Sequence, residues 1–167
     1  MNHLFFSIIC MPKLITPILS RSWDDYYPDT PYNQSIESKD PVTYQTKYYY
    51  YVNNVIFDNL ISQAIYASSY IIHMVIEDTT FTNISSTSNH GGAIFLTNSI
   101  YLIQNKVCSS KCISSNNGHH MYINAGNTKL KTTLSSFAKC GNYSHRNSII
   151  SVTSANNYLA NSNISKC

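Results

Sequence analysis

Short apolar stretches alternate with polar turns along most of the chain. Ala93–Leu96, Ile100–Ile103 and Met121–Ile123 are such stretches, and Ser85–His90 and Asn124–Thr128 are predicted turns. None of the stretches shows the sustained i, i+3, i+4, i+7 spacing of an amphipathic helix. The pattern therefore predicts short β-strands joined by turns and disfavours a helical solenoid.

The apolar positions also recur at an interval of about 28 residues, which indicates a repeat architecture. The clearest column of equivalent positions contains Ile84, Cys112, Cys140 and Cys167. The column three residues upstream contains Phe81, Ser109, Phe137 and Ile164. Two further columns contain Ile65, Ile94, Met121 and Ile149, and Met74, Leu102, Leu130 and Leu159. Because several columns keep the same phase, we expect a genuine repeat.

A unit of this length with three short strands matches one coil of a parallel β-helix, in which coils stack about 4.8 Å apart. Equivalent side chains then lie above one another, which explains why Phe recurs with Phe and Cys with Cys. We therefore predict an all-β protein, a right-handed single-stranded parallel β-helix of the pectin-lyase-like kind, because parallel connections are right-handed. About four coils occupy residues 53–167, behind an irregular N-terminal cap.

Residues 1–52 do not share the repeat. Residues 1–20 hold two apolar runs, Leu4–Met11 and Leu14–Leu19, each shorter than the roughly 20 apolar residues that span a bilayer. This segment is either a signal peptide or a buried first strand or cap. Residues 21–52 contain one tryptophan, three prolines and five acids, which predicts an irregular aromatic leader that ends in a strand.

Composition and charge further limit the class of protein to which the chain can belong. The 167 residues are 43% hydrophobic and 11% charged, which is enough for one domain with a core and too few charges for a coiled coil or an acidic tail. Residues 1–78 hold all eight acids and four bases, whereas residues 79–167 hold seven bases and no acid, so the net charges are −4 and +7 and sum to +3. The positive charge of residues 79–167 either binds an anionic partner or only keeps the protein soluble.

The bases of the second part are Lys106, Lys111, Lys129, Lys131, Lys139, Arg146 and Lys166. Lys111 and Lys139 are one repeat unit apart, and each directly precedes a cysteine of the clearest column. We therefore expect these two side chains to stack on one face, where they suit an anionic glycan. We expect no nucleic-acid partner.

Enzymes of this fold cleave acidic polysaccharides with clustered carboxylates, which bind Ca²⁺ or act as acid and base. The acids of the repeat are Asp58, Glu77 and Asp78, and Asp58 lies 20 residues before Asp78, which is not a whole coil. We therefore expect no carboxylate pair. No Ser–His–acid set is expected either, because no acid follows residue 78. The sequence assigns no catalytic, cofactor-binding or metal-binding residue.

Three histidines flank the glycine turns. His90 lies one coil from His119 and His120, so a pair could share a transition metal, yet the next coil offers Asn147 or Ser148 where a third ligand is needed. We therefore predict exposed turn histidines that hold no metal.

Cysteine spacing leaves two alternatives open. Stacked at the rung spacing, Cys112, Cys140 and Cys167 either form a disulfide or pack as a ladder of inward thiols, and the ladder is favoured because inward rotamers in a tight coil rarely suit a bridge. If Cys10 is lost with a signal peptide, four cysteines including Cys108 remain, which fits a secreted protein. Secretion is also weakly supported by N-x-S sequons at Asn33, Asn83, Asn142 and Asn163.

Some of these motifs resemble known repeats. F-T-N-I at Phe81–Ile84, with Ile in place of a final Asn, and G-G-A-I at Gly91–Ile94 resemble the repeat of polymorphic outer membrane proteins. Ser109–Ile123 and Phe137–Ser144 are similar to coils of right-handed parallel β-helix repeat proteins of protists, a trichomonad-like surface family. The resemblance covers about residues 55–167 and implies a secreted or surface-exposed β-helix with an adhesive or unknown role.

We therefore expect a non-catalytic, secreted or cell-surface repeat module that adheres or binds a ligand, either an anionic glycan or a host or cell-surface molecule. The alternatives are a degenerate polysaccharide lyase or glycoside hydrolase of the β-helix type, or a non-functional fragment of a larger repeat protein. We expect no transmembrane span and no cofactor. Because Cys167 falls in mid-coil, we also expect either a longer parent protein or end-to-end self-association.

Overall fold

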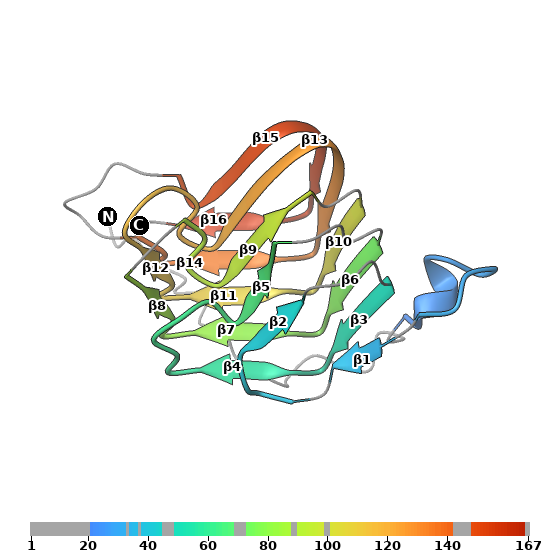
Figure 1. The fold of residues 1–167 in the computed structure, drawn as a ribbon, viewed down its shortest axis with the longest axis horizontal. Helices are drawn as coiled ribbons and strands as arrows, with labels where there is room; N and C mark the ends of the chain where they lie inside the picture. The colour runs from blue at the N-terminus through green and yellow to red at the C-terminus, as the bar shows by residue number, and fades with distance from the viewer. Residues whose placement is uncertain are drawn as a thin grey trace, which may run out of the picture.

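A computed structural model shows strands that pair in parallel from one coil to the next (Figure 1). The structure describes residues 21–32, 34–36, 38–44, 49–68, 73–87, 90–98, 101–141 and 148–165. Within these residues the only helix is the short 3-10 turn η1 (Trp23–Asp25), and none is long and apolar enough to cross a membrane. The predicted all-β solenoid of parallel coils is therefore confirmed.

The strands form three faces. Face A contains β1 (Gln34–Ile36), β3 (Tyr49–Asn53), β6 (His73–Glu77), β10 (Tyr101–Asn105) and the later parts of β13 (Met121–Thr133) and β15 (Ile150–Ala160). Face B contains β4 (Ile56–Asp58), β7 (Thr80–Thr82), β11 (Cys108–Ser110), β14 (Ser136–Ala138) and β16 (Asn163–Ser165). Face C contains β2 (Val42–Tyr44), β5 (Ile65–Ala67), β9 (Ile94–Thr97) and the first parts of β13 and β15. Between faces B and C, β8 (Ser85–Ser86) pairs with β12 (Ile113–Ser114).

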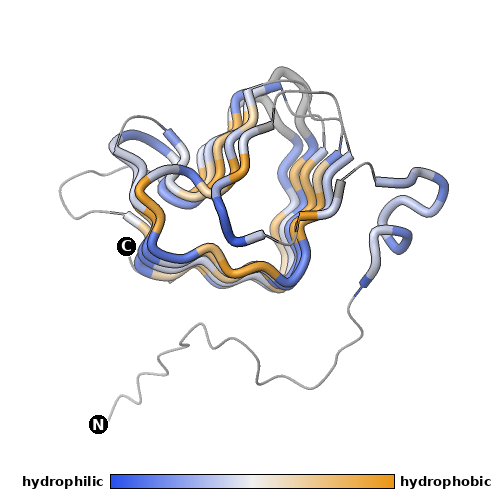
Figure 2. Tube along the Cα trace, turned by 60° about the horizontal axis from the view of Figure 1, so that its bottom comes forward, coloured by the Kyte–Doolittle hydropathy of each residue, from blue (hydrophilic) through white to orange (hydrophobic). Residues whose placement is uncertain are grey.

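Strand register fixes the length of each coil. Face B aligns Phe57, Phe81, Ser109, Phe137 and Ile164, whose numbers differ by 24, 28, 28 and 27. The predicted members of this column are therefore confirmed, and Phe57 extends it. In Figure 2 the tubes of successive coils superimpose closely, as this regular register requires.

The inward column next to it is also confirmed over three coils. Ile84, Cys112 and Cys140 are all fully buried. The N–H of Ile113 donates to the Ile84 oxygen and the N–H of Gly141 donates to the Cys112 oxygen, so consecutive coils are in direct contact. Cys167 lies outside the described residues.

Two predicted columns are wrong at their last coil. The pairing puts Ile150 in the place predicted for Ile149, and Asn157 in the place predicted for Leu159. Ile150 takes the first place because it lies 29 residues after Met121 rather than 28. Asn157 takes the second because the register shifts farther along the pair, where β13 advances by four residues while β15 advances by two. A count of residues along the sequence cannot detect such a shift.

Polar segments also remain inside the ladder where turns were predicted. Asn124–Thr128 lies within the continuous strand β13, and Ser85–Ser86 of the predicted turn Ser85–His90 forms β8. The N–H of Asn98 donates to the Asn124 oxygen of the next coil, so the backbone stays paired at the bend. In this solenoid, a polar segment therefore does not mark the end of a strand.

Sharp corners at both ends of face B are made by residues with positive φ. The first corner uses Asn54, Asp78, Lys106, Leu134 and Asn161, and the second uses Asn59, Asn83, Lys111 and Lys139. Asparagine adopts this left-handed conformation more readily than most residues. These corners hold side chains outward at one position per coil.

Candidate functional site

The corner that follows face B carries the two lysines whose stacking was predicted. Lys111 and Lys139 have φ values of 54° and 53° and directly follow Ser110 and Ala138, which pair with each other. The N–H of Lys111 donates to the Ala138 oxygen at 3.2 Å, so the two corners lie one coil apart. Both side chains are exposed. The predicted stacking on one face is therefore confirmed, and we call this pair the basic corner.

The acids of the coils have partners other than the basic corner. Asp78 lies at the other end of face B, where its carboxylate is 3.7 Å from the Lys106 ammonium. Asp58 accepts hydrogen bonds from the side chains of two asparagines, at 2.7 and 3.2 Å. As predicted, Asp58 and Asp78 occupy different columns, because Asp58 pairs with Thr82. Among the described residues no acid forms an ion pair with the basic corner.

The two lysines of β13 lie on a different face from the basic corner. Lys129 and Lys131 are both exposed on face A, and the Lys129 ammonium is 5.1 Å from the centre of the Tyr101 ring, which partly satisfies its charge. Arg146 and Lys166 lie outside the described residues. Face A is therefore a second basic surface on the same coil as Lys139, and it provides a matched control for charge effects.

The prediction of exposed histidines is wrong for His119 and His120, which are 1% and 0% exposed. The reason is the preceding Gly118, whose φ of +74° turns the chain so that the next residues enter the solenoid. The Nδ1 atom of His119 accepts the N–H of Ser114 at 3.1 Å. His90 is half-buried and stacks on Tyr122, with ring centres 4.3 Å apart.

His120 lies inside the solenoid between two aromatic rings. Its ring centre is 5.6 Å from that of Phe81 and 4.6 Å from that of Phe137. Burial lowers the pKa of His120 to about 3, since the charged imidazolium would lose its hydration in this interior. His120 is therefore neutral in the folded protein at physiological pH.

The hydrogen bonds of His120 belong to one chain of donors and acceptors, which we call the interior network. Its members are Gln104, Ser109, Cys112, His120, Thr132 and Cys140. The Thr132 hydroxyl donates to Gln104 Oε1 at 3.3 Å, so the Gln104 amide nitrogen faces His120 Nε2 at 3.1 Å and donates to it. His120 Nδ1 then carries the proton and donates to Ser109 Oγ at 3.0 Å. The network thus selects one tautomer of the neutral imidazole.

The network ends on two buried thiols. The Ser109 hydroxyl donates to Cys112 Sγ at 3.2 Å and lies 3.5 Å from Cys140 Sγ. A hydrogen bond to Cys140, together with burial, raises the pKa of the Cys112 thiol, and the same bond lowers the pKa of Cys140. Both thiols are free, so the inward ladder is confirmed for these two coils, whereas Cys108 is disulfide-bonded.

No metal centre arises from these groups. In the part of the chain that the structure describes, no three His, Cys, Asp or Glu side chains come together to hold a metal ion. The Nδ1 atom of His90 instead accepts the N–H of Asn117 at 3.2 Å, and His120 is turned into the core. His90 therefore bonds to the backbone of a turn, whereas His120 lies in the core, and the two rings do not share a metal site.

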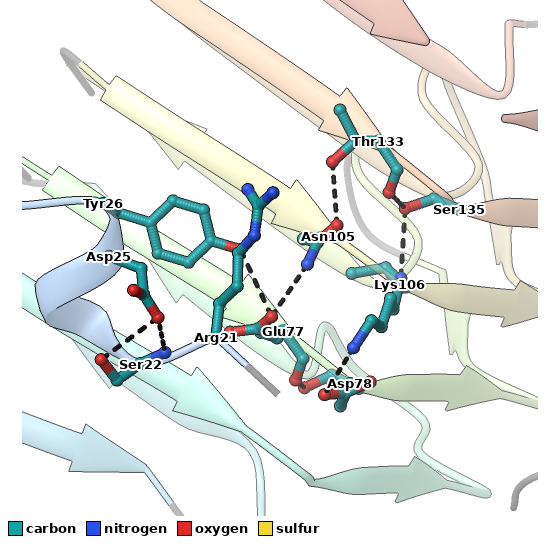
Figure 3. Close-up of polar contacts among 12 residues, drawn as sticks. Arg21, Ser22, Asp25, Tyr26, Glu77, Asp78, Asn105, Lys106, Thr133 and Ser135 are labelled. Carbon is teal, nitrogen blue, oxygen red and sulfur yellow. Dashed lines mark hydrogen bonds and ion pairs between the residues drawn. The ribbon is translucent and has the colours of Figure 1, made fainter. Parts of the chain in front are cut away.

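Sequence reasoning missed the buried carboxylate of Glu77 (Figure 3). It accepts hydrogen bonds from the hydroxyls of Tyr26 and Tyr51 at 3.3 and 3.2 Å, and from the Asn105 amide at 2.8 Å. Burial and the charge of Glu77 raise the pKa of Tyr26 to about 12 and raise the pKa of Tyr51 as well. The available signal was the phase of Glu77, which is 28 residues before Asn105 and pairs with it.

Glu77 anchors the leader to face A. Trp23 is only 1% exposed and packs with Tyr51 and Val75, and its indole N–H donates to the Thr30 oxygen. Figure 1 shows η1 at one side of the stack, beside β1 and β3. The first part of the predicted leader, residues 21–32, is therefore a lateral cover for one face, whereas its later residues supply β1, β2 and most of β3 to the coils.

The chain matches no protein-family model, no curated protein and no solved structure. The fold and the described sites define its class as a parallel β-solenoid with an exposed basic corner, a polar interior network and a covered lateral face. The resemblance to polymorphic outer membrane proteins and to protist surface repeats stays a prediction.

Proposed function

We propose that this protein is a non-catalytic β-solenoid module that binds an anionic polysaccharide along its basic corner, at the cell surface or after secretion. The observation that carries the proposal is the stacking of Lys111 and Lys139 one coil apart, with no ion pair to an acid of the described residues. Adhesion to an acidic glycan coat is the role that this binding would serve.

Electrostatics favours such a ligand. Two ammonium groups on adjacent coils repel each other, and an anionic group placed between them removes this repulsion. A polymer with regularly spaced charges can follow a corner that presents one position per coil, because the solenoid is itself a linear array. A polyanion therefore gains more from this corner than a single small anion does.

The bond at Cys108 supports an extracellular location. Cys108 is disulfide-bonded and begins β11 of face B. Disulfides persist in oxidising compartments and are rare in the cytosol. The engagement of Asp58, Glu77 and Asp78 described above offers no support for the alternative of a polysaccharide lyase or hydrolase.

The test compares two double variants of equal charge. Lys111→Ser with Lys139→Ser should weaken binding to heparin and to polygalacturonate by about 0.4–2 kcal/mol, or about two- to thirtyfold, in low salt. Lys129→Ser with Lys131→Ser removes the same charge from face A and should leave most of the affinity. Binding should also fall as salt is added.

Three outcomes would contradict the proposal. They are no binding to either polymer in low salt, equal loss in the two double variants, and shortening of polygalacturonate during incubation with the protein. The last would favour the enzymatic alternative.

A further inference from the structure

A hollow of about 490 Å³ lies between the end of the leader and the first strands of face A. Its lining contains Tyr32, Ser35, Tyr51, Asn53 and Asn54. Cavities of this size are typical of small-molecule sites in proteins. The hollow is distinct from the basic corner, which lies on later coils at the end of face B.

One wall is an aromatic ring held in place and left partly open. Tyr32 is 44% exposed, although its ring contacts Trp23 and Tyr51 with centres 5.9 and 5.8 Å apart. The two neighbouring rings are themselves buried. Tyr32 therefore offers a fixed apolar surface without needing to be ordered by a ligand.

Another wall carries two side-chain amides. Asn53 ends β3 and Asn54 forms the corner with φ of 56°, where its N–H donates to the Glu77 oxygen at 3.1 Å. None of the hydrogen bonds found among the described residues uses the side-chain amide of Asn53 or Asn54. Each amide offers both donors and an acceptor to a ligand.

Among the described residues, none that lines the hollow has a charged side chain. The carboxylate of Glu77 is buried and accepts a hydrogen bond from the Tyr51 hydroxyl at 3.2 Å. An anion or a cation would lose hydration in this hollow without gaining a partner of opposite charge. An apolar ligand would leave the amides unsatisfied.

We infer that this hollow binds a neutral sugar ring. The C–H face of the sugar packs on Tyr32, and its hydroxyls exchange hydrogen bonds with the amides of Asn53 and Asn54. A neutral sugar is the ligand class that offers both an apolar face and several hydroxyls without charge. The inference does not rest on the proposed function, because it uses different residues and a ligand of different charge.

Saturation-transfer NMR on the full chain tests this site with defined probes. The neutral probes are the methyl glycosides of glucose, galactose, mannose and N-acetylglucosamine, and the charged counterpart is methyl glucuronoside. Each probe is used at roughly 10 mM, a concentration at which millimolar affinity is detected. We expect transfer to the ring C–H protons of at least one neutral probe and at least fivefold weaker transfer to the glucuronoside. Emission from Trp23, the single tryptophan, should change with the same probe because its ring contacts Tyr32.

Variants assign the signal to the hollow. Tyr32→Ala and Asn53→Ala should each reduce transfer at least fivefold, and so should Asn54→Gly, which keeps the positive φ. Tyr158→Ala is the matched control, since Tyr158 is 57% exposed on β15, and it should leave transfer unchanged. The far-ultraviolet β signal of each variant confirms its fold.

The inference is overturned if no neutral probe shows transfer, if the glucuronoside binds as well as the neutral probes, or if transfer survives Tyr32→Ala and Asn53→Ala in folded protein. The Lys111→Ser, Lys139→Ser variant should retain the neutral-sugar signal. Failure of polyanion binding and failure of sugar binding are therefore separate results.

Discussion

At the scale of single residues, the interior of this solenoid combines apolar side chains with a satisfied polar chain. Ser109 is fully buried between the levels of Phe81 and Phe137, yet its hydroxyl serves both His120 and the thiol of Cys112. Each side chain in this chain has at least one hydrogen-bond partner, which reduces the cost of burying its polar atoms. The same arrangement makes the interior sensitive to a change of protonation or of one atom.

Acid should destabilise the fold through His120. Its pKa is lowered to about 3 in the folded state, so the unfolded chain, with a pKa near 6.5, binds the proton more tightly between these two values. The stabilising contribution is complete above pH 6.5 and is lost as the pH falls towards 3. Between pH 6.5 and 4.5 the unfolding free energy should fall by about 2 kcal/mol more in the native protein than in His120→Gln.

Denaturant titrations at several pH values measure this difference. Parallel curves for the native protein and His120→Gln would contradict a neutral buried imidazole.

Replacing the buried thiol by a hydroxyl should also destabilise the fold. Cys112→Ser should cost about 1–3 kcal/mol, because a hydroxyl needs a stronger acceptor than this interior guarantees. Thermal unfolding checks the loss, with Lys111→Ser at the adjacent exposed position as a control that should change stability by no more than about 0.5 kcal/mol. An unchanged melting temperature for Cys112→Ser would mean that the thiol is not inside the stack.

At the scale of elements, the G-G-A-I segment owes its two glycines to contact between coils. Gly91 has a φ of +72°, and a Cβ on Gly92 would lie 1.9 Å from the His119 oxygen of the next coil. The motif was recognised in the sequence from its letters alone, and the structure supplies its physical reason. The neighbouring histidines could not be placed by sequence because the inward turn after Gly118 depends on backbone conformation.

Gly92→Ala should therefore separate two coils. Because the obstructing atom is backbone, we expect a loss of about 2–4 kcal/mol in the unfolding free energy, measured by denaturant titration. Thr87→Ala, at an exposed residue of the same coil, should stay within about 0.5 kcal/mol of the native protein. Equal stability of the two variants would show that the coils are not packed as closely as described.

At the scale of the whole molecule, the coil period was predictable because inward positions must repeat their apolar character at each level. The period correctly predicted the columns of stacked residues that contain Phe81 and Ile84. It also predicted that Lys111 and Lys139 occupy equivalent positions on adjacent coils. It failed where the register between β13 and β15 shifted. The phase of Glu77 places it beside Asn105 but could not reveal its burial, because part of its cover comes from Tyr26 of the leader. Long-range packing of a non-repeating segment has no periodic signal.

Register between adjacent coils is the claim on which both the basic corner and the interior network depend. Nitroxide labels on cysteines introduced at Lys111 and Lys139 test it directly, since both positions are exposed and the free thiols of the described residues, Cys112 and Cys140, are buried. Labels one rung apart, at a backbone separation of about 4.8 Å, should give a strongly dipolar-broadened spectrum in frozen solution. The pair at Lys111 and Lys131, on different faces, should show far weaker broadening. A Lys111–Lys139 spectrum equal to the sum of the two singly labelled proteins would contradict the stacked solenoid.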